Sequence, residues 1–397
     1  MSFDLLQKRL PEIQSELRDA NLDGWLLYDL HARNTVTNKL TGLGDLTRRY
    51  FIMIPANGEP YAISHKIEDV NWEGWPWQRE KYAAWKELDG ALRKAIGGAK
   101  KVAMEISNND AVPAMDLVPL GVVEMIRNLG LEVMSSGDLV SRFYSAWSAE
   151  DLASHRRSSV VLMQAAHTAF TRLARAIAAD EPVHEGEVSA WIIADLTARG
   201  CGTGAANIVA NGINAANPHY EPIGLGAQFK RGDVVLIDLW AKENESTVFS
   251  DQTWMGYLGP KVPDRIADIF KVVTGARDAA VDFLKESYAA GKTLMGGEVD
   301  DVTRKHIADR NYGHAFVHRT GHSIDQSVHG MGPNIDNLET NETRRLLPGV
   351  AFSIEPGIYL AGDVGMRSEI NVYMSQSGPE VTTPEPQTEM LALLGNE

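Results

Sequence analysis

Four acidic residues lie within apolar stretches of the sequence, where a charged side chain needs a partner. Asp238 lies in VVLIDLW and Asp251 in VFSDQTW, while Glu355 lies in AFSIEPGIY and Glu369 in MRSEINVYM. A charge that is buried without compensation costs several kcal/mol. Neighbouring carboxylates also repel one another unless a cation lies between them. The four acids therefore indicate a site for cations.

Turn-forming residues separate the two acids of each pair. The segment KENES predicts a hairpin that brings the strands of Asp238 and Asp251 side by side, so that the two acids face each other. The Gly and Asp of LAGDVG predict a second hairpin between Glu355 and Glu369. Bridging carboxylates and one imidazole suit a pair of divalent ions about 3.5 to 4 Å apart. Ligands of this kind favour Mn, Co or Zn.

A histidine-rich segment could supply the imidazole. Residues 314–330 read HAFVHRTGHSIDQSVHG and contain four of the eleven histidines of the chain. His318, His322 and His329 are spaced so that they would also share one face of a helix. Gly321 and the polar residues after it favour a strand that runs into a loop instead.

Two more residues could reach the same site. His219 lies in NPHYEP, a segment typical of a loop. Arg367 precedes Glu369 by two residues on the same predicted strand, so the two side chains share a face. The guanidinium of Arg367 could bind a substrate or could pair with a carboxylate that binds metal, and the sequence leaves both roles open.

The elements that must position these residues fall into two groups. Residues 1–147 alternate helical and β-rich segments, which predicts a mixed α/β domain. Ser148, with Asp151 three residues later, predicts the N-terminus of a long helix. In residues 148–397 long helices interleave with short β-rich runs, which predicts an α+β domain whose strands carry the acids.

Composition limits the classes of partner. A length of 397 residues favours two domains. The formal charge of −15 argues against nucleic acid or an anionic membrane as the partner, because both attract clustered Lys and Arg. No apolar run approaches the roughly 20 residues needed to span a bilayer, and no signal peptide is recognisable at the start. We therefore expect a soluble, cytoplasmic protein.

Cys201 is the only cysteine, so no disulfide can form within the chain. Its setting in ARGCGTG favours a small apolar packing role over a nucleophilic one, because a nucleophile would need a base beside it.

The ordered acids and histidine resemble a known family. Asp238, Asp251, His322, Glu355 and Glu369 lie in LIDLW, SDQTW, RTGHS, SIEPGIY and MRSEI, a series similar to the metallopeptidases with the pita-bread fold. That family includes methionine aminopeptidase, aminopeptidase P and prolidase. The resemblance runs from about residue 150 to the end, and the preceding domain is similar to the creatinase-type N-terminal domain. It implies an α+β protein, with a pita-bread catalytic domain after a smaller α/β domain.

The resemblance implies a role for each ligand of two divalent metal ions. Asp238 would bind one ion, Asp251 and Glu369 would bridge both, and His322 with Glu355 would bind the second. Glu355 would also act as general base toward a hydroxide that bridges the ions.

The resemblance extends to the substrate. His219 would face the substrate amide, and His329 would contact the carbonyl on the leaving side, which makes both catalytic candidates beside Glu355. His318 begins the HRTGH motif, and Arg367 resembles the arginine that prolidases use near the proline carboxylate. These four residues are the expected substrate contacts.

Some positions depart from the family pattern. The usual GHGIG is GHSID here, and Gly330 stands where a glutamate often follows the second histidine. The two aspartates are 13 residues apart, which we attribute to a longer hairpin turn. Asp251 is followed by QTW where an arginine commonly follows the threonine, although Thr253 stays on the ligand face of its strand. These changes affect the expected substrate pocket and not the metal set.

The expected function is hydrolysis of the Xaa-Pro bond in dipeptides, as in prolidase. An aminopeptidase P that acts on longer Xaa-Pro peptides is the alternative enzyme, and a metal-free binding protein on the same scaffold is the alternative from another class. Creatinase works without metals, so the retained ligands argue against it. A homodimer is expected, in which Trp72, Trp75 and Trp77 of NWEGWPWQ either cover the cleft of the partner subunit or pack within their own domain.

Overall fold

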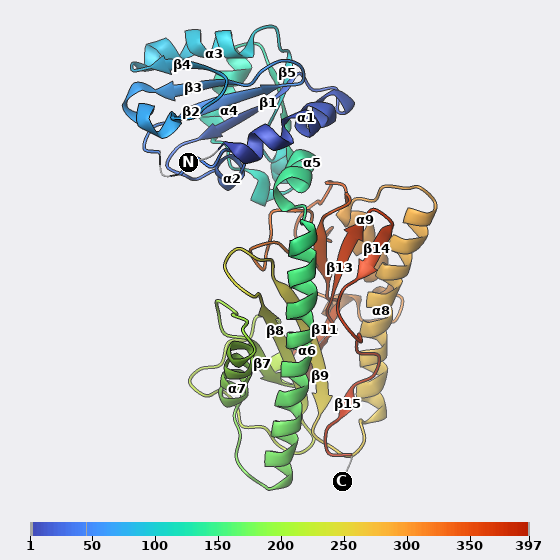
Figure 1. The fold of residues 1–397 in the computed structure, drawn as a ribbon. Coiled ribbons are helices and arrows are strands. Elements are labelled where there is room, and N and C mark those ends of the chain that lie inside the picture. The colour runs from blue at the N-terminus through green and yellow to red at the C-terminus, as the bar shows by residue number, and fades with distance from the viewer. Residues whose placement is uncertain (1–2, 45, 396–397) are drawn as a thin grey trace. The chain divides into compact units, whose positions relative to one another are not determined.

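The chain divides into two compact units, Met1–Tyr144 and Ser145–Glu397. The computed structural model describes residues 3–44 and 46–395 (Figure 1). The division lies close to the boundary predicted after residue 147, and the assignment of these segments as domains stays a prediction. Within the part of the chain that is described, no helix is long and apolar enough to cross a membrane.

The first unit is built on one mixed sheet of six strands. The strand order is β4-β3-β2-β1-β5-β6, with β1–β2 and β2–β3 antiparallel and the other pairs parallel. The alternation predicted for this segment is therefore confirmed, although helices and a strand that the sequence did not indicate also occur. Its elements are α1 (Asp4–Asp19), β1 (Gly24–Asp29), α2 (Thr35–Thr41), β2 (Tyr50–Pro55), β3 (Tyr61–His65), β4 (Gln78–Tyr82), α3 (Leu88–Ile96), β5 (Lys101–Met104), α4 (Leu120–Asn128), β6 (Glu132–Ser135) and α5 (Gly137–Val140).

The tryptophan cluster packs within this unit. Trp72 is 3% exposed, and its ring lies edge-on to Trp75 with the centroids 5.5 Å apart. Trp75 in turn contacts Trp77 at 5.0 Å and Phe3 at 5.0 Å. The packing alternative therefore accounts for the contacts of these rings.

In its described residues, the second unit contains four α-helices and several short sheets. The helix that begins the unit has the predicted capping box, because Ser148 Oγ accepts from Asp151 N at 3.1 Å and Asp151 Oδ2 accepts from Ser148 N at 2.9 Å. Its elements are α6 (Ala149–Ala178), α7 (Glu185–Ala198), β7 (Ile208–Asn211), β8 (Val234–Ala241), β9 (Ser250–Tyr257), α8 (Asp264–Ala289), α9 (Gly296–Ala308), β10 (Ala351–Ile354), β11 (Gly357–Leu360), β12 (Val364–Arg367), β13 (Ile370–Ser375), β14 (Gly378–Val381) and β15 (Leu391–Ala392).

The helices cover the strands from two sides, and α8 and α9 also share an apolar core with the other face of strands β7, β8 and β9. The four-stranded sheet β15-β9-β8-β7 shares an apolar core with α6 and α7. The sheet β10-β13-β14 packs against α8 and α9 (Figure 1). This α+β arrangement confirms the predicted fold class, and it leaves the strands that carry the acids in the middle of the unit.

Candidate metal centre

The hairpin of β8 and β9 carries two of the acids on one face. Asp238 pairs with Thr253, and Trp240 pairs with Asp251. Paired residues of antiparallel strands point to the same side, as do residues two apart on one strand. The predicted hairpin is confirmed. The two aspartates are diagonal neighbours, however, and not directly opposite each other as we expected.

The other two acids lie at interruptions of the sheet. Glu355 falls between β10 and β11, and Glu369 falls between β12 and β13. The ladder stops at the pair Ile354–Ile370 and resumes at Gly357–Arg367. Pro356 has no N–H group to donate, so the ladder cannot continue through it. The continuous strands expected here are therefore wrong, although both acids remain beside each other.

The interruption frees Glu355 to hold the histidine segment. Glu355 N donates to Thr320 O at 2.7 Å instead of joining the ladder. His322 is bonded to β10, because its N–H donates to Ser353 Oγ at 2.9 Å and its carbonyl accepts from Ser353 N at 2.8 Å. As predicted, the segment is not an α-helix, but isolated bridges at Gly321 and Ser323 stand where a strand was expected.

The ring of His322 is oriented to present Nε2 to the acids. Nδ1 lies 3.1 Å from Ser323 O, which can only accept a hydrogen bond. A proton on Nδ1 leaves a lone pair on Nε2. Nε2 lies 3.3 Å from Glu355 Oε1 and 3.6 Å from Asp251 Oδ2.

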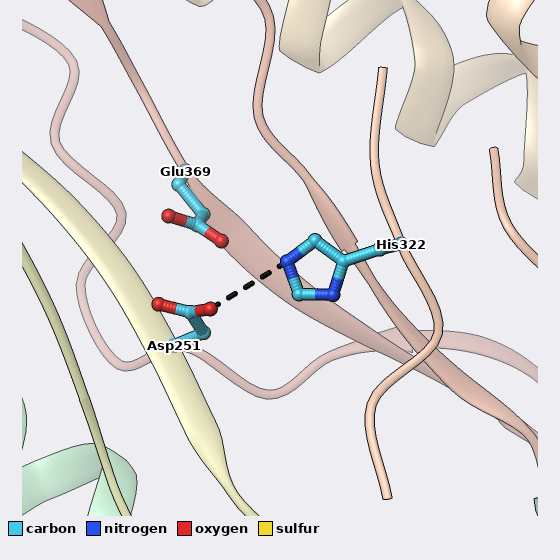
Figure 2. A group of neighbouring side chains, drawn as sticks. All are labelled: Asp251, His322 and Glu369. Atoms are coloured by element: carbon cyan, nitrogen blue, oxygen red, sulfur yellow. Dashed lines mark ion pairs between the residues drawn. The ribbon is translucent and has the colours of Figure 1, made fainter. Parts of the chain in front are cut away.

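Three side chains form the centre of the cluster. Asp251, His322 and Glu369 are buried, and each offers one ligand atom within 4.8 Å of the others. Figure 2 shows the three side chains pointing toward one another, with Asp251 on β9 and Glu369 immediately before β13. Thr253 Oγ1 joins Asp238 to this centre, because it lies 3.0 Å from Asp238 Oδ1 and 2.9 Å from Glu369 Oε2. The five predicted ligands therefore lie together.

The cluster has buried oxygens that no protein group satisfies. Among the described residues, Asp251 Oδ1 and Glu369 Oε1 have no hydrogen-bond partner. Burial, followed by the charges of Asp238 and Glu355, raises the pKa of Asp251 well above its usual range. Burial and the charge of Asp251 do the same to the pKa of Glu369. Cations would satisfy these oxygens and offset the repulsion, so the residues fit a metal site.

Arg367 is the positive charge that the chain itself provides. Its guanidinium donates from Nη2 to Asp238 Oδ2 and from Nε to Thr253 Oγ1 at 3.0 Å. The residue is 3% exposed. Of the two roles left open by the sequence, pairing with a carboxylate of the cluster accounts for these contacts.

Tyr359 is a member of the site that the sequence reasoning missed. Its hydroxyl lies 2.7 Å from His318 Nε2 and accepts from Arg367 Nη1 at 3.4 Å. Burial raises the pKa of Tyr359 to about 12, so the hydroxyl keeps its proton. The sequence signal for Tyr359 was the alternation of side chains along β11. Gly357 pairs with Arg367, and Tyr359 follows Gly357 by two residues, so its side chain lies on the same face.

The remaining two histidines lie outside the cluster. The ring of His329 packs edge-on against His322, with the centroids 4.4 Å apart. Loss of water from the ring, followed by the charges of His322 and Arg319, lowers the pKa of His329. The charge of His219 makes a smaller contribution in the same direction, although His219 itself is exposed on its loop.

Two departures from the family pattern meet in space. A side chain on Gly330 would place its Cβ 2.8 Å from Asp325 Oδ2 and 3.0 Å from Ser323 Oγ. Asp325 is 5% exposed, and its carboxylate accepts from Met331 N at 3.0 Å and from Ser327 N at 2.8 Å. The aspartate of GHSID therefore takes up the space beside the glycine.

Cys201 is buried in the core between α6, α7 and the β8–β9 hairpin. Burial raises the pKa of its thiol, so the thiolate is disfavoured. The predicted packing role agrees with this position.

Together these features define a pita-bread metallopeptidase unit, which follows a smaller α/β unit in the sequence. The profile of metallopeptidase family M24 matches residues 157–376. The chain belongs to this family.

The chain is similar to several known peptidases. It is 38% identical over 162 residues to an Xaa-Pro dipeptidase of Lactobacillus delbrueckii subsp. lactis, a match that covers 41% of this chain and 40% of that protein. It is 25% identical over 393 residues to a probable dipeptidase PepE of Mycobacterium bovis, covering 94% and 93%. The chain thus spans about two fifths of the Lactobacillus relative and nearly all of the mycobacterial one.

Solved structures share the fold over the whole chain. Dipeptidase PepE of Mycobacterium ulcerans superposes with a TM-score of 0.71 at 23% identity, and the match covers 99% of both chains. A prolidase of Thermococcus sibiricus gives a TM-score of 0.63 at 21% identity, also with 99% of both chains covered.

Proposed function

We propose that this chain is a prolidase, which hydrolyses the bond before the C-terminal proline of Xaa-Pro dipeptides with two divalent metal ions. The observation that carries the proposal is the buried cluster of Asp251, His322 and Glu369, in which two carboxylate oxygens lack a partner. The dipeptidase names of the relatives support the choice of substrate.

The charge of the cluster supports two ions over one. Four carboxylates face one guanidinium, which leaves three negative charges uncompensated in a site that is almost closed to water. A single divalent ion would leave a net negative charge, whereas a second ion removes it. Asp238 would hold one ion, His322 and Glu355 the other, and Asp251 and Glu369 both.

The bound ions would supply an ionised water at neutral pH and would stabilise the oxyanion of the cleaved amide. The side chains of the chain supply the proton movements and the orientation. Glu355 Oε1 accepts from Ser353 Oγ at 3.0 Å, which fixes its carboxylate for the role of general base. His219 would contact the amide of the substrate, and His329 would contact its carbonyl. The hydrogen bond with the Tyr359 hydroxyl would keep the ring of His318 in position.

Arg367 has a supporting role in this proposal. Because its guanidinium is held by Asp238 and Thr253, it would keep Asp238 oriented for the metal. These bonds use two of its five N–H groups, so a contact with the proline carboxylate would use the others.

The test is release of proline from dipeptides by the metal-depleted protein after Mn²⁺, Co²⁺ or Zn²⁺ is restored. Ala-Pro and Leu-Pro are expected to be cleaved, and Ala-Ala is not. The Asp251→Asn variant should lose both activity and metal, measured by equilibrium dialysis. Asp363→Asn, an exposed acid on the β11–β12 turn, is the matched control and should keep both. Failure of the metal-loaded protein to release proline from any Xaa-Pro dipeptide would refute the proposal.

Aminopeptidase P is the second candidate. It is favoured by a putative Xaa-Pro aminopeptidase of Mycoplasma pneumoniae, 34% identical over 187 residues that cover 46% of this chain and 48% of that protein. Comparison of Ala-Pro with Ala-Pro-Ala separates the two activities. A prolidase prefers the dipeptide, whereas an aminopeptidase P prefers the tripeptide. A homodimer is also proposed, and sedimentation as a 43.6 kDa monomer would contradict it.

A further inference from the structure

Glu185 is a buried carboxylate outside the metal cluster. It is the first residue of α7 and is 0% exposed. Among the described residues, no Lys, Arg or His forms an ion pair with it, so its charge has to be offset in another way. Buried carboxylates without a cation need several hydrogen-bond donors.

Four donors surround this carboxylate, and all come from one segment. Oε1 accepts from Asn211 N at 2.9 Å and from Asn214 Nδ2 at 2.8 Å. Oε2 accepts from Tyr220 Oη at 2.7 Å and from Ala227 N at 2.7 Å. One carboxylate therefore ties the beginning of the segment 211–227 to its end.

The backbone at the start of α7 reinforces the end of this segment. Glu185 N donates to Ala227 O at 3.1 Å, and Gly186 N donates to Leu225 O at 2.9 Å. Gly226 has a φ of +73°, and a Cβ there would lie 2.4 Å from Glu185 Oε2. The chain can pass this close to the carboxylate only because residue 226 is a glycine.

In the middle of the segment, apolar burial involves Tyr220, which is partly buried against a core cluster. His219 is exposed, and the side chains of Ile223 and Leu225 are 97% and 56% exposed. The beginning of the segment also packs beside β12, where Gly365 N donates to Gly212 O at 2.9 Å. Besides the packing of Tyr220 and the bond that its hydroxyl accepts from Asn214 Nδ2 at 3.0 Å, the bonds of Tyr220 and Ala227 to Glu185 therefore hold residues 217–226.

We infer that Glu185 is a positioning residue that holds the loop carrying His219 in its working conformation. The inference rests on the proposed function, because it assigns His219 a contact with the peptide substrate. Tyr220, the direct neighbour of His219, is bonded to the carboxylate, so loss of this bond would release the imidazole from its place. A displacement of about 1 Å at a catalytic group can cost about 100-fold in rate.

The test combines hydrogen exchange with a double-mutant cycle. Glu185→Gln keeps the size of the side chain but turns an amide NH₂ toward two donors. Exchange at residues 217–226 should accelerate about tenfold, the factor for loss of one hydrogen bond to a charged group, while α8 exchanges as before. Glu187→Gln, on the same helix but bonded only to His184, is the matched control and should leave the loop unchanged.

The activity cycle asks whether Glu185 acts through His219. Glu185→Gln should lower kcat for Ala-Pro by about 100-fold and leave the bound metal unchanged. The double variant Glu185→Gln/His219→Ala should be no less active than His219→Ala alone, because both changes remove the same interaction. Tyr220→Phe, which removes one donor, should give a smaller change of the same kind and decides the question if Glu185→Gln does not fold.

Unchanged exchange at residues 217–226 in both Glu185→Gln and Tyr220→Phe would overturn the inference. Additive losses in the double variant would overturn it as well. Absence of peptidase activity would count against the proposed function alone. The exchange measurement needs no substrate, so it still tests whether Glu185 holds the loop.

Discussion

Arg367 and Asp238 form a buried ion pair at the edge of the cluster of acids, with the two side chains 4% and 10% exposed. The pair connects β8 to β12, two strands that belong to different sheets. The guanidinium therefore helps to hold the Asp238 carboxylate in its position beside the other acids.

Removal of this guanidinium should destabilise the metal-free protein. Arg367→Met leaves Asp238 buried without its partner, which is expected to lower the free energy of unfolding by about 3 to 5 kcal/mol. Urea unfolding in the presence of a chelator measures the change. Arg265→Met, which removes an exposed pair with Asp363, should cost at most about 1 kcal/mol. Equal losses in the two variants would contradict the structural role of Arg367.

Neutralising one acid of the cluster should have the opposite effect. Asp251→Asn removes a repelling charge and offers an amide donor near the unpaired Glu369 Oε1. The free energy of unfolding of the metal-free protein should rise by about 1 to 3 kcal/mol, the cost of an unsatisfied buried group. Mn²⁺ should raise the Tm of the wild type and not of the variant. A metal-free variant that is less stable than the wild type would argue against repulsion within the cluster.

The buried His155 should make the folded protein less stable at acidic pH. It lies on α6, is 0% exposed, and bonds to Phe249 O at 2.8 Å and to Thr382 Oγ1 at 2.7 Å. Burial lowers its pKa from 6.5 to about 4. Below pH 6.5 the unfolded chain takes up a proton that the folded chain refuses. The stability contributed by neutral His155 is therefore complete above pH 6.5 and is lost as the pH falls toward 4.

The measurement is urea unfolding of the metal-free wild type and of His155→Gln across this window. The stability of the wild type should fall more steeply than that of the variant, because glutamine does not titrate. His314→Gln, at an exposed position, should follow the wild type. Parallel curves for the wild type and His155→Gln would show that this histidine does not set the limit.

Gly330 and Asp325 should behave as a coupled pair. Gly330→Glu restores the residue common in the family. The new side chain would come too close to Asp325 Oδ2, and this overpacking should lower the free energy of unfolding by about 1 to 3 kcal/mol. Adding Asp325→Gly makes room for the new side chain, so the double variant should be more stable than the sum of the single losses. Additive losses, measured by urea unfolding, would show that the two departures are independent.

The sequence predicted the main elements from their periodicity, and it predicted that the buried acids lie together for a physical reason. Acids within apolar, β-branched runs have few permitted environments, so Asp238 and Asp251 indicated both a buried hairpin and a cation. The interruption of the sheet at Glu355 was missed because the runs on both sides of Pro356 look like one strand. The signal was present in the proline itself, which cannot donate to a ladder.

Residues that act through three-dimensional proximity gave at most a weak signal in the sequence. Tyr359 and Glu185 have ordinary neighbours in the chain, and Glu185 in HEGEV looks like any acid in the first turn of a helix. Only folding brings the four donors of segment 211–227 around the Glu185 carboxylate. The same holds for Asp325 and Gly330, whose separate departures from the family pattern became one feature once their contact was known.

The position of Cys201 has a practical consequence. A single sulfhydryl buried beside the β8–β9 hairpin can be alkylated only when the surrounding core opens. The rate at which iodoacetamide modifies this thiol can be followed as a single mass increment. It therefore measures how fast the core that supports the strands of Asp238 and Asp251 opens.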